Sequence, residues 1–172
     1  MKKQLTVLAL AIGMLVSFGA SAQQKIGHIN ADMLLQMMPE TKAAQAQLEK
    51  YGRQLEKDLK DMETELQAKI TKYREDDKMM TNLSRETRTT EIQELQGRIQ
   101  DYSMRAQEDL QDKQVELLTP IIERATDAVQ KVAKENGFTY ILDSSESKAV
   151  VIFAENGEDI MDMVKKELGI TE

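Results

Sequence analysis

Apolar residues recur every three or four positions through the middle of the chain, and this spacing predicts long helices. Such a rhythm is that of a helix with one apolar side. It runs from residue 44 to residue 73 through Ala44, Leu48, Tyr51, Leu55, Leu59, Met62, Leu66, Ile70 and Tyr73. Pro39 and Glu40 precede it, and both residue types are favoured in the first turn of a helix. We therefore expect a long helix that begins at Pro39.

A second stripe follows the same rhythm, at Ile92, Leu95, Ile99, Tyr102, Ala106, Leu110, Leu117 and Ile121. The residue numbers of seven facing pairs, such as Tyr73 with Ile92 and Ala44 with Ile121, add up to 165. A constant sum is what two antiparallel helices require, because each step along one helix matches a step back along the other. Two unrelated helices are the alternative. We predict an antiparallel coiled-coil arm over residues 39–135, with the fold-back between Asn82 and Leu83 and the tip near 79–86.

The two ends of the chain have the pattern of a small sheet. Residues 25–30 read as a strand and residues 33–38 as a helical turn. Residues 138–142 and 149–154 read as a β-hairpin after a helix end at Asn136-Gly137. Asp159 is placed to start a last helix. The fold class is thus α+β, with a long α-helical hairpin attached to a small β-sheet body formed by residues 23–38 and 136–172.

This body is small for independent stability. Three strands with open apolar edges and no disulfide bury little surface, and such edges invite pairing with other copies. We expect several copies to pool their strands into one closed barrel or layered body. The residues expected at the contact are Ile26, Ile29, Tyr140, Leu142, Val150 and Ile152.

Residues 1–22 have the composition of a signal peptide. A basic start leads into the apolar run Leu5 to Phe18, which is too short to span a bilayer. Ala20-Ser21-Ala22 is a small-x-small cleavage pattern, so we expect cleavage after Ala22 and export. An uncleaved membrane anchor is the alternative. The mature chain would have 150 residues and a net charge of −9.

Composition excludes many chemistries. The chain has no Cys, one His and a formal net charge of −7. These values argue against thiolate or multi-His metal sites and against general affinity for nucleic acids. No phosphate-binding Gly-x-x-x-x-Gly-Lys motif is present. We expect no enzyme activity and no cofactor, and we interpret His28 as structural.

The predicted tip carries apolar residues without seam partners. Met79, Met80 and Leu83 lie there, beyond the last apolar pair, so we expect the last turns to be loosely closed. These residues either cap the end of the coil or offer an adaptable contact to varied apolar partners, for which unbranched Met is well suited. The cations Lys78, Arg85 and Arg88 lie close by, mixed with acidic residues.

The chain resembles the Skp (OmpH) family of periplasmic chaperones over nearly its whole mature length. The resemblance rests on four segments and on the order strand, long helical hairpin, strand pair and short helix. The segments are residues 25–30, residues 38–44, the strand pair from Tyr140 to Ala154, and residues 159–164.

The resemblance implies a homotrimer with a β-barrel body and three helical tentacles around a cavity. It also implies an ATP-independent holdase that keeps unfolded outer-membrane β-barrel proteins soluble until the membrane insertion machinery takes them. The residues themselves, independently of the resemblance, make Met79, Met80 and Leu83 at the tip the candidate client contacts. Known members are basic and attract lipopolysaccharide, whereas this arm is acidic, so we do not carry over contact with lipopolysaccharide or membranes. The rival interpretation is a structural coiled-coil envelope spacer or adaptor without clients.

Overall fold

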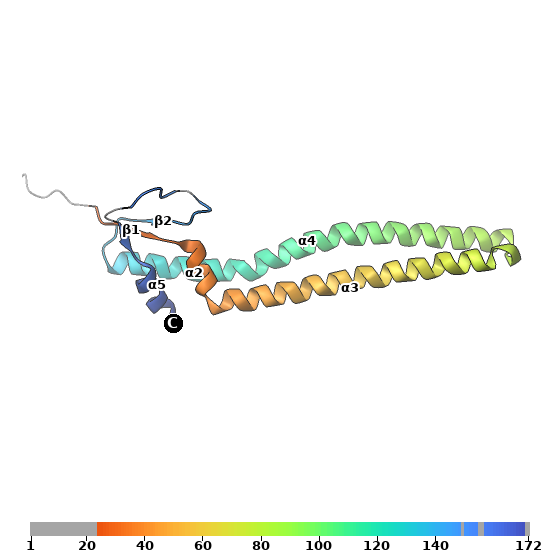
Figure 1. Ribbon diagram of the computed structural model, residues 1–172, viewed down its shortest axis with the longest axis horizontal. Coiled ribbons are helices and arrows are strands. Elements are labelled where there is room, and N and C mark those ends of the chain that lie inside the picture. The colour runs from red at the N-terminus through yellow and green to blue at the C-terminus, as the bar shows by residue number, and fades with distance from the viewer. Residues whose placement is uncertain (1–23, 149, 155–156, 171–172) are drawn as a thin grey trace, which may run out of the picture.

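The computed structural model describes residues 24–148, 150–154 and 157–170. A long two-helix arm projects from a small body at one end of the molecule (Figure 1). The arm consists of α3 (Pro39–Asp76) and α4 (Asn82–Glu135), joined by the short 3-10 helix η2 (Asp77–Met79). The α+β fold class and the helical hairpin are confirmed. The expected signal peptide lies outside the described residues.

Both predicted stripes lie in the seam between α3 and α4. Every stripe residue on the two helices is buried or half-buried. At 1.5 Å per residue, the 38 residues of α3 extend over about 57 Å. In the arm itself Leu95 is buried most deeply, at 1% exposure. The arm is therefore a thin, two-helix structure with a narrow apolar seam.

The fold-back lies earlier than the sequence predicts. Thr81 caps α4, and its hydroxyl accepts a hydrogen bond from the Ser84 amide at 3.2 Å. Asn82 is thus already in the first turn of α4, so the prediction of a turn between Asn82 and Leu83 is wrong. Polar contacts between the helices join residues whose numbers add up to between 160 and 164. A local cap, rather than the apolar register, sets the position of the turn.

The sheet of the body is parallel, in the order β2-β1-β3. Its strands are β1 (Ile26–Ile29), β2 (Tyr140–Asp143) and β3 (Glu158–Asp159). The predicted β-hairpin with residues 149–154 is wrong, because the described residues 150–154 form no strand. Just after β2, the Ser145 hydroxyl accepts a hydrogen bond from the Asp32 amide in the first turn of α2 (Ala31–Met37) and donates one to the side chain of Asn30. These contacts direct the chain after β2 away from that strand. The third strand of the sheet is β3, which pairs with β1.

The core of the body lies between the sheet, α2, the last turns of α4 and α5 (Met161–Leu168). Leu34, Ile160 and Val164 are at most 1% exposed. A Cβ on Gly27 would lie 2.9 Å from both Ile141 and Phe138, so glycine permits this close approach. Four residues of α4 complete the core: Ile121, Ala125, Ala128 and Val132. Although the sequence assigns them to the arm, they pack in the body.

The α4 helix passes from arm to body without a break. Pro120 lies inside it, and α4 bends between the arm and the body (Figure 1). Proline removes one backbone hydrogen bond and crowds the preceding turn, which bends a helix. The helix ends at Glu135, and Gly137 takes the left-handed conformation with φ 70°. The predicted stop at Asn136-Gly137 is confirmed.

Candidate functional site

Two apolar surfaces stand out, one at the tip of the arm and one on the sheet. At the tip, Met79 is 91% exposed and Leu83 is 74% exposed, while Met80 is half-buried. The backbone of Met80 is extended between η2 and α4, so the two helices do not enclose these side chains. A hollow of about 290 Å³ lies beside them, lined in part by Met79, Met80 and Ser84.

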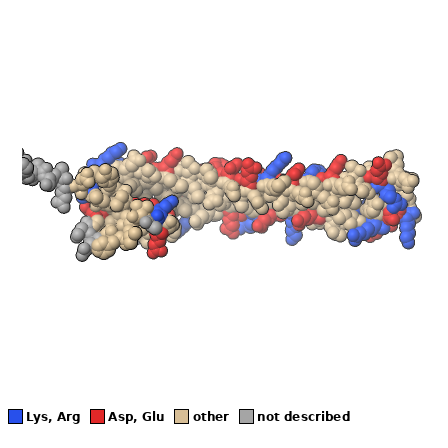
Figure 2. Space-filling model, turned by 90° about the horizontal axis from the view of Figure 1, so that it is seen from above, with Lys and Arg blue, Asp and Glu red and all other residues tan. Residues whose placement is uncertain are grey.

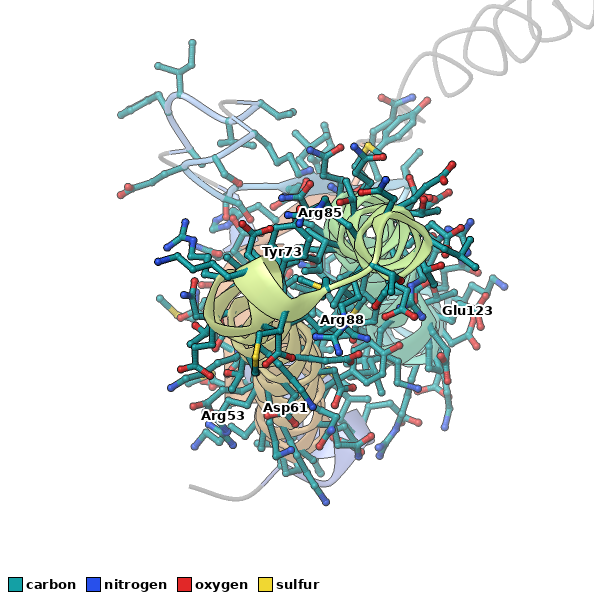
Figure 3. The ribbon with its side chains drawn as sticks, turned by 90° about the vertical axis from the view of Figure 1, so that its right-hand side faces the viewer. Arg53, Asp61, Tyr73, Arg85, Arg88 and Glu123 are labelled. Carbon is teal, nitrogen blue, oxygen red and sulfur yellow. The ribbon has the colours of Figure 1, made fainter. Side chains whose placement is uncertain are left out.

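Ion pairs close the arm just behind these apolar residues. The Arg85 guanidinium pairs with the Asp77 carboxylate and also donates to the Asp77 carbonyl at 2.9 Å. Arg88 donates to Asp76 at 2.7 Å. We call these two pairs the tip clasp. Arg85 and Arg88 both lie at the tip end of the arm (Figure 3).

The sequence predicted a loosely closed end of the arm, but the tip clasp joins the two helices there. Apolar partners are indeed missing beyond Tyr73 and Ile92, but opposite charges join the helices there instead. Farther down, Lys69 donates to Glu91 at 3.1 Å across the same seam. The sequence contained a signal for the clasp, since paired aspartates precede the turn and two arginines follow it. Two of the tip cations are therefore engaged by carboxylates.

The outer face of the sheet is the second apolar surface. Side chains alternate along a strand, so Ile26 points to the opposite side from Ile29. Tyr140 and Leu142 on β2 are 56% and 39% exposed, and Ile26 is 43% exposed. The register places Ile26 beside Tyr140. Three of the six residues expected at an interface thus share one open face.

The other three residues lie in different surroundings. Val150 and Ile152 are 60% and 95% exposed, in the segment after β2 that forms no strand. Phe153, which the sequence analysis did not select, is 80% exposed beside them. Ile29 is 3% exposed and packs in the core of its own chain, because it points from β1 toward α4 and α5.

A polar cluster fixes where this exposed segment starts. The Asp143 carboxylate accepts hydrogen bonds from the Ser145 amide at 2.9 Å, the Ser145 hydroxyl at 2.5 Å and the Ala31 amide at 3.3 Å. Burial by itself raises the pKa of Asp143, but these hydrogen bonds and the charge of Lys148 outweigh it and hold the pKa below 3.8. Ser145, 1% exposed, also accepts from the Asp32 amide at 3.1 Å.

The arm is charged along its whole length (Figure 2). In the seam, Tyr102 donates to Asp58 at 3.4 Å, and burial, followed by the charge of Asp58, raises the pKa of Tyr102.

In the part of the chain that the structure describes, no cluster of His, Asp or Glu is arranged to hold a metal ion. In the same part, no helix combines the length and apolar character needed to cross a bilayer.

Comparison with known proteins places the chain in a family. A family model described as outer membrane protein (OmpH-like) matches residues 25–168. The chain belongs to this OmpH-like family. The solved structure of a Caulobacter crescentus protein described as OmpH-like has the same fold, with a TM-score of 0.73 at 16% identity, covering 84% of this chain and 83% of that chain.

Curated relatives of this OmpH-like chain match over its full length. The chaperone protein Skp of Photorhabdus laumondii is 29% identical over 98% of this chain and 99% of its own. The chaperone protein Skp of Pectobacterium atrosepticum is 26% identical with the same coverage. The resemblance to a family of chaperones, which is not a family of enzymes, is thereby confirmed.

Proposed function

We propose that this OmpH-like protein is an ATP-independent periplasmic holdase chaperone. It binds unfolded outer-membrane β-barrel proteins and prevents their aggregation before the insertion machinery takes them. The observation that carries the proposal is the exposure of Met79 and Leu83, at 91% and 74%, at the end of a long thin arm. Flexible apolar side chains on an extended arm suit partners without fixed structure.

The apolar face of the sheet supports assembly into a homotrimer with a closed β-barrel body. Ile26, Tyr140, Leu142, Val150 and Ile152 expose apolar side chains that another copy would cover. Three arms would then surround a cavity for the client. The chain would reach the periplasm through the signal peptide of residues 1–22, cleaved after Ala22. The acidic arm gives no support for a role on lipopolysaccharide or membranes.

The test removes the apolar side chains of the tip. In a Met79→Ser/Met80→Ser/Leu83→Ser variant we expect the oligomer to remain and the suppression of aggregation of an unfolded β-barrel protein to fall by roughly half or more, because apolar contact area is lost. Light scattering at several ratios of chaperone to client measures both. A Met33→Ser/Met37→Ser variant is the control, since it removes exposed methionines from α2 in the body. Undiminished protection by the tip variant would show that the arms hold the client elsewhere.

The second candidate is a structural coiled-coil spacer or adaptor of the envelope. The tip clasp favours it, because Arg85 and Arg88 keep the seam closed to its end. The two candidates differ in what they capture. Cross-linking with denatured β-barrel proteins separates them, since a spacer would capture none and a holdase would capture several.

A further inference from the structure

A third apolar surface lies on α4, on the side of the helix that faces away from the seam. Met104, Val115 and Ile122 are 65%, 62% and 48% exposed. Their spacings of 11 and 7 residues return to the same side of a helix with 3.6 residues per turn. Seam residues such as Leu110 and Leu117 fall on the other side. We call Met104, Val115 and Ile122 the α4 face.

Carboxylates border this face along one edge. Residues 101–123 contain six Asp or Glu and two Lys or Arg. Asp101, Glu108 and Asp112 fall beside the α4 face by helical spacing, and one cation, Arg105, falls on the same edge, so this edge carries more negative than positive charge. The side chain of Glu123 lies on the outer side of α4, away from α3 (Figure 3). Figure 2 views the arm from the side of α4 and shows charged side chains, with carboxylates prominent near mid-length, along the edges of the arm and uncharged side chains between them.

Most of these carboxylates are open to an external cation. Among the described residues, Glu116 is the one of the six that forms an ion pair, with Lys113 at 2.8 Å. The opposite edge of the α4 face is neutral, with Gln107, Gln111 and Gln114. An apolar line with a negative edge favours a ligand that carries apolar and positively charged side chains together.

The same charges disfavour other occupants. A second copy that docked through its own α4 face would bring two acidic edges together, and like charges at an interface are unfavourable. A phosphate-bearing ligand would meet the same repulsion. The cationic, apolar polypeptide is the occupant that the charge pattern fits.

We propose that the α4 face binds unfolded client segments that combine apolar side chains with Lys or Arg. This inference rests on the proposed holdase function and adds to it the location of a second contact and the charge of the segments it selects. The tip supplies apolar contact without charge preference, whereas the α4 face sorts segments by charge.

Peptide binding tests the proposal. Fluorescence anisotropy with the purified oligomer compares three short labelled peptides that alternate Leu with Lys, Leu with Glu, and Ser with Lys. We expect the Leu–Lys peptide to bind about tenfold more tightly than either of the others, and added salt to weaken it. A Met104→Gln/Val115→Gln/Ile122→Gln variant should weaken this peptide about tenfold, since Gln keeps the helix and removes the apolar contacts.

Two further variants separate the effect of the carboxylates on peptide binding from the effect of the apolar side chains. Glu108→Gln/Asp112→Asn/Glu123→Gln should reduce the preference for Leu–Lys over Leu–Glu while keeping the apolar contact. The Met79→Ser/Met80→Ser/Leu83→Ser variant should keep the preference. Circular dichroism checks that each variant folds, and light scattering checks its mass.

Three results would overturn the inference. They are equal binding of the Leu–Lys and Leu–Glu peptides, unchanged binding by the α4-face variant, and loss of the oligomer in that variant, which would assign the face to contact between copies. Aggregation assays on the wild-type protein keep the two proposals apart. Absent protection there counts against the holdase function, whereas intact protection without peptide selectivity counts against the α4 face alone.

Discussion

Asp143 shows how one side chain can direct a whole segment. Its carboxylate holds Ser145 and the first turn of α2 together, over a sequence separation of more than 100 residues. The chain therefore leaves β2 toward α2, and Val150, Ile152 and Phe153 remain exposed. A local polar cluster thus sets the position of one apolar surface proposed for assembly.

Acid should weaken this cluster. Because the pKa of Asp143 in the folded chain is below its ordinary value of 3.8, its contribution to stability is complete above that value and is lost as the pH falls through the folded pKa. We expect the free energy of unfolding to fall as the pH drops below the ordinary value of 3.8, and to fall less in Asp143→Asn. Urea unfolding at fixed protein concentration measures this. Glu146→Gln, an exposed neighbour, is the control and should follow the wild type; an equal slope in Asp143→Asn would contradict the assignment.

At the scale of elements, the arm is held by two kinds of contact. An apolar seam joins α3 and α4 along most of their length, while the tip depends on the clasp of Arg85 with Asp77 and Arg88 with Asp76. These side chains are 33–44% exposed, so each pair contributes about 0.2–1 kcal/mol and is screened by salt. The closure of the tip therefore depends on ionic conditions.

Breaking the clasp should loosen the tip alone. In Arg85→Gln/Arg88→Gln we expect amide hydrogen exchange around η2 to become about two- to fivefold faster, while the seam near Leu95 is unchanged. High salt should do the same to the wild type. Lys57→Gln, which removes an exposed pair with Asp61 inside α3, serves as the control. Unaltered exchange at the tip would show that the cap at Thr81 suffices without the ion pairs.

At the scale of the whole molecule, a small core carries a long arm. Among the residues that the structure describes, ten buried ones form the core cluster, and the opposite face of the sheet is open. So few buried residues support a domain only marginally. Assembly would bury the exposed face and so stabilise both the body and the base of the arm.

Charge placed on the open face of the sheet and on the exposed segment after β2 should separate the copies. In Leu142→Asp/Ile152→Asp we expect the mass in solution to drop to that of one chain, because burying a carboxylate in an apolar interface costs several kcal/mol. Size-exclusion chromatography with light scattering at micromolar concentration measures this. Leu83→Asp at the tip is the control and should leave the mass unaltered. A wild-type protein that is already monomeric there would remove the basis of the trimer proposal.

Among the candidate site residues, sequence reasoning was most informative at the tip. Met79 and Leu83 were expected to lack seam partners because the apolar stripes end before them, and both are exposed. The body was harder to predict. Ile26 and Ile29 are both apolar strand residues, and composition alone did not separate the outward side chain from the one in the core.

The amino-acid pattern was sufficient to predict the two long helices: the start of α3 at Pro39, the two apolar stripes and the end of α4 before Asn136-Gly137. Helices depend on contacts within a few residues, so periodicity and caps suffice to specify them. The order of the strands, the direction of Ile29, the clasp at the tip and the exposure of Val150, Ile152 and Phe153 came from the folded chain alone. A parallel sheet joins strands more than 100 residues apart. An apolar segment satisfies a strand pattern whether or not a partner strand lies beside it, so pairing depends on the whole folded chain.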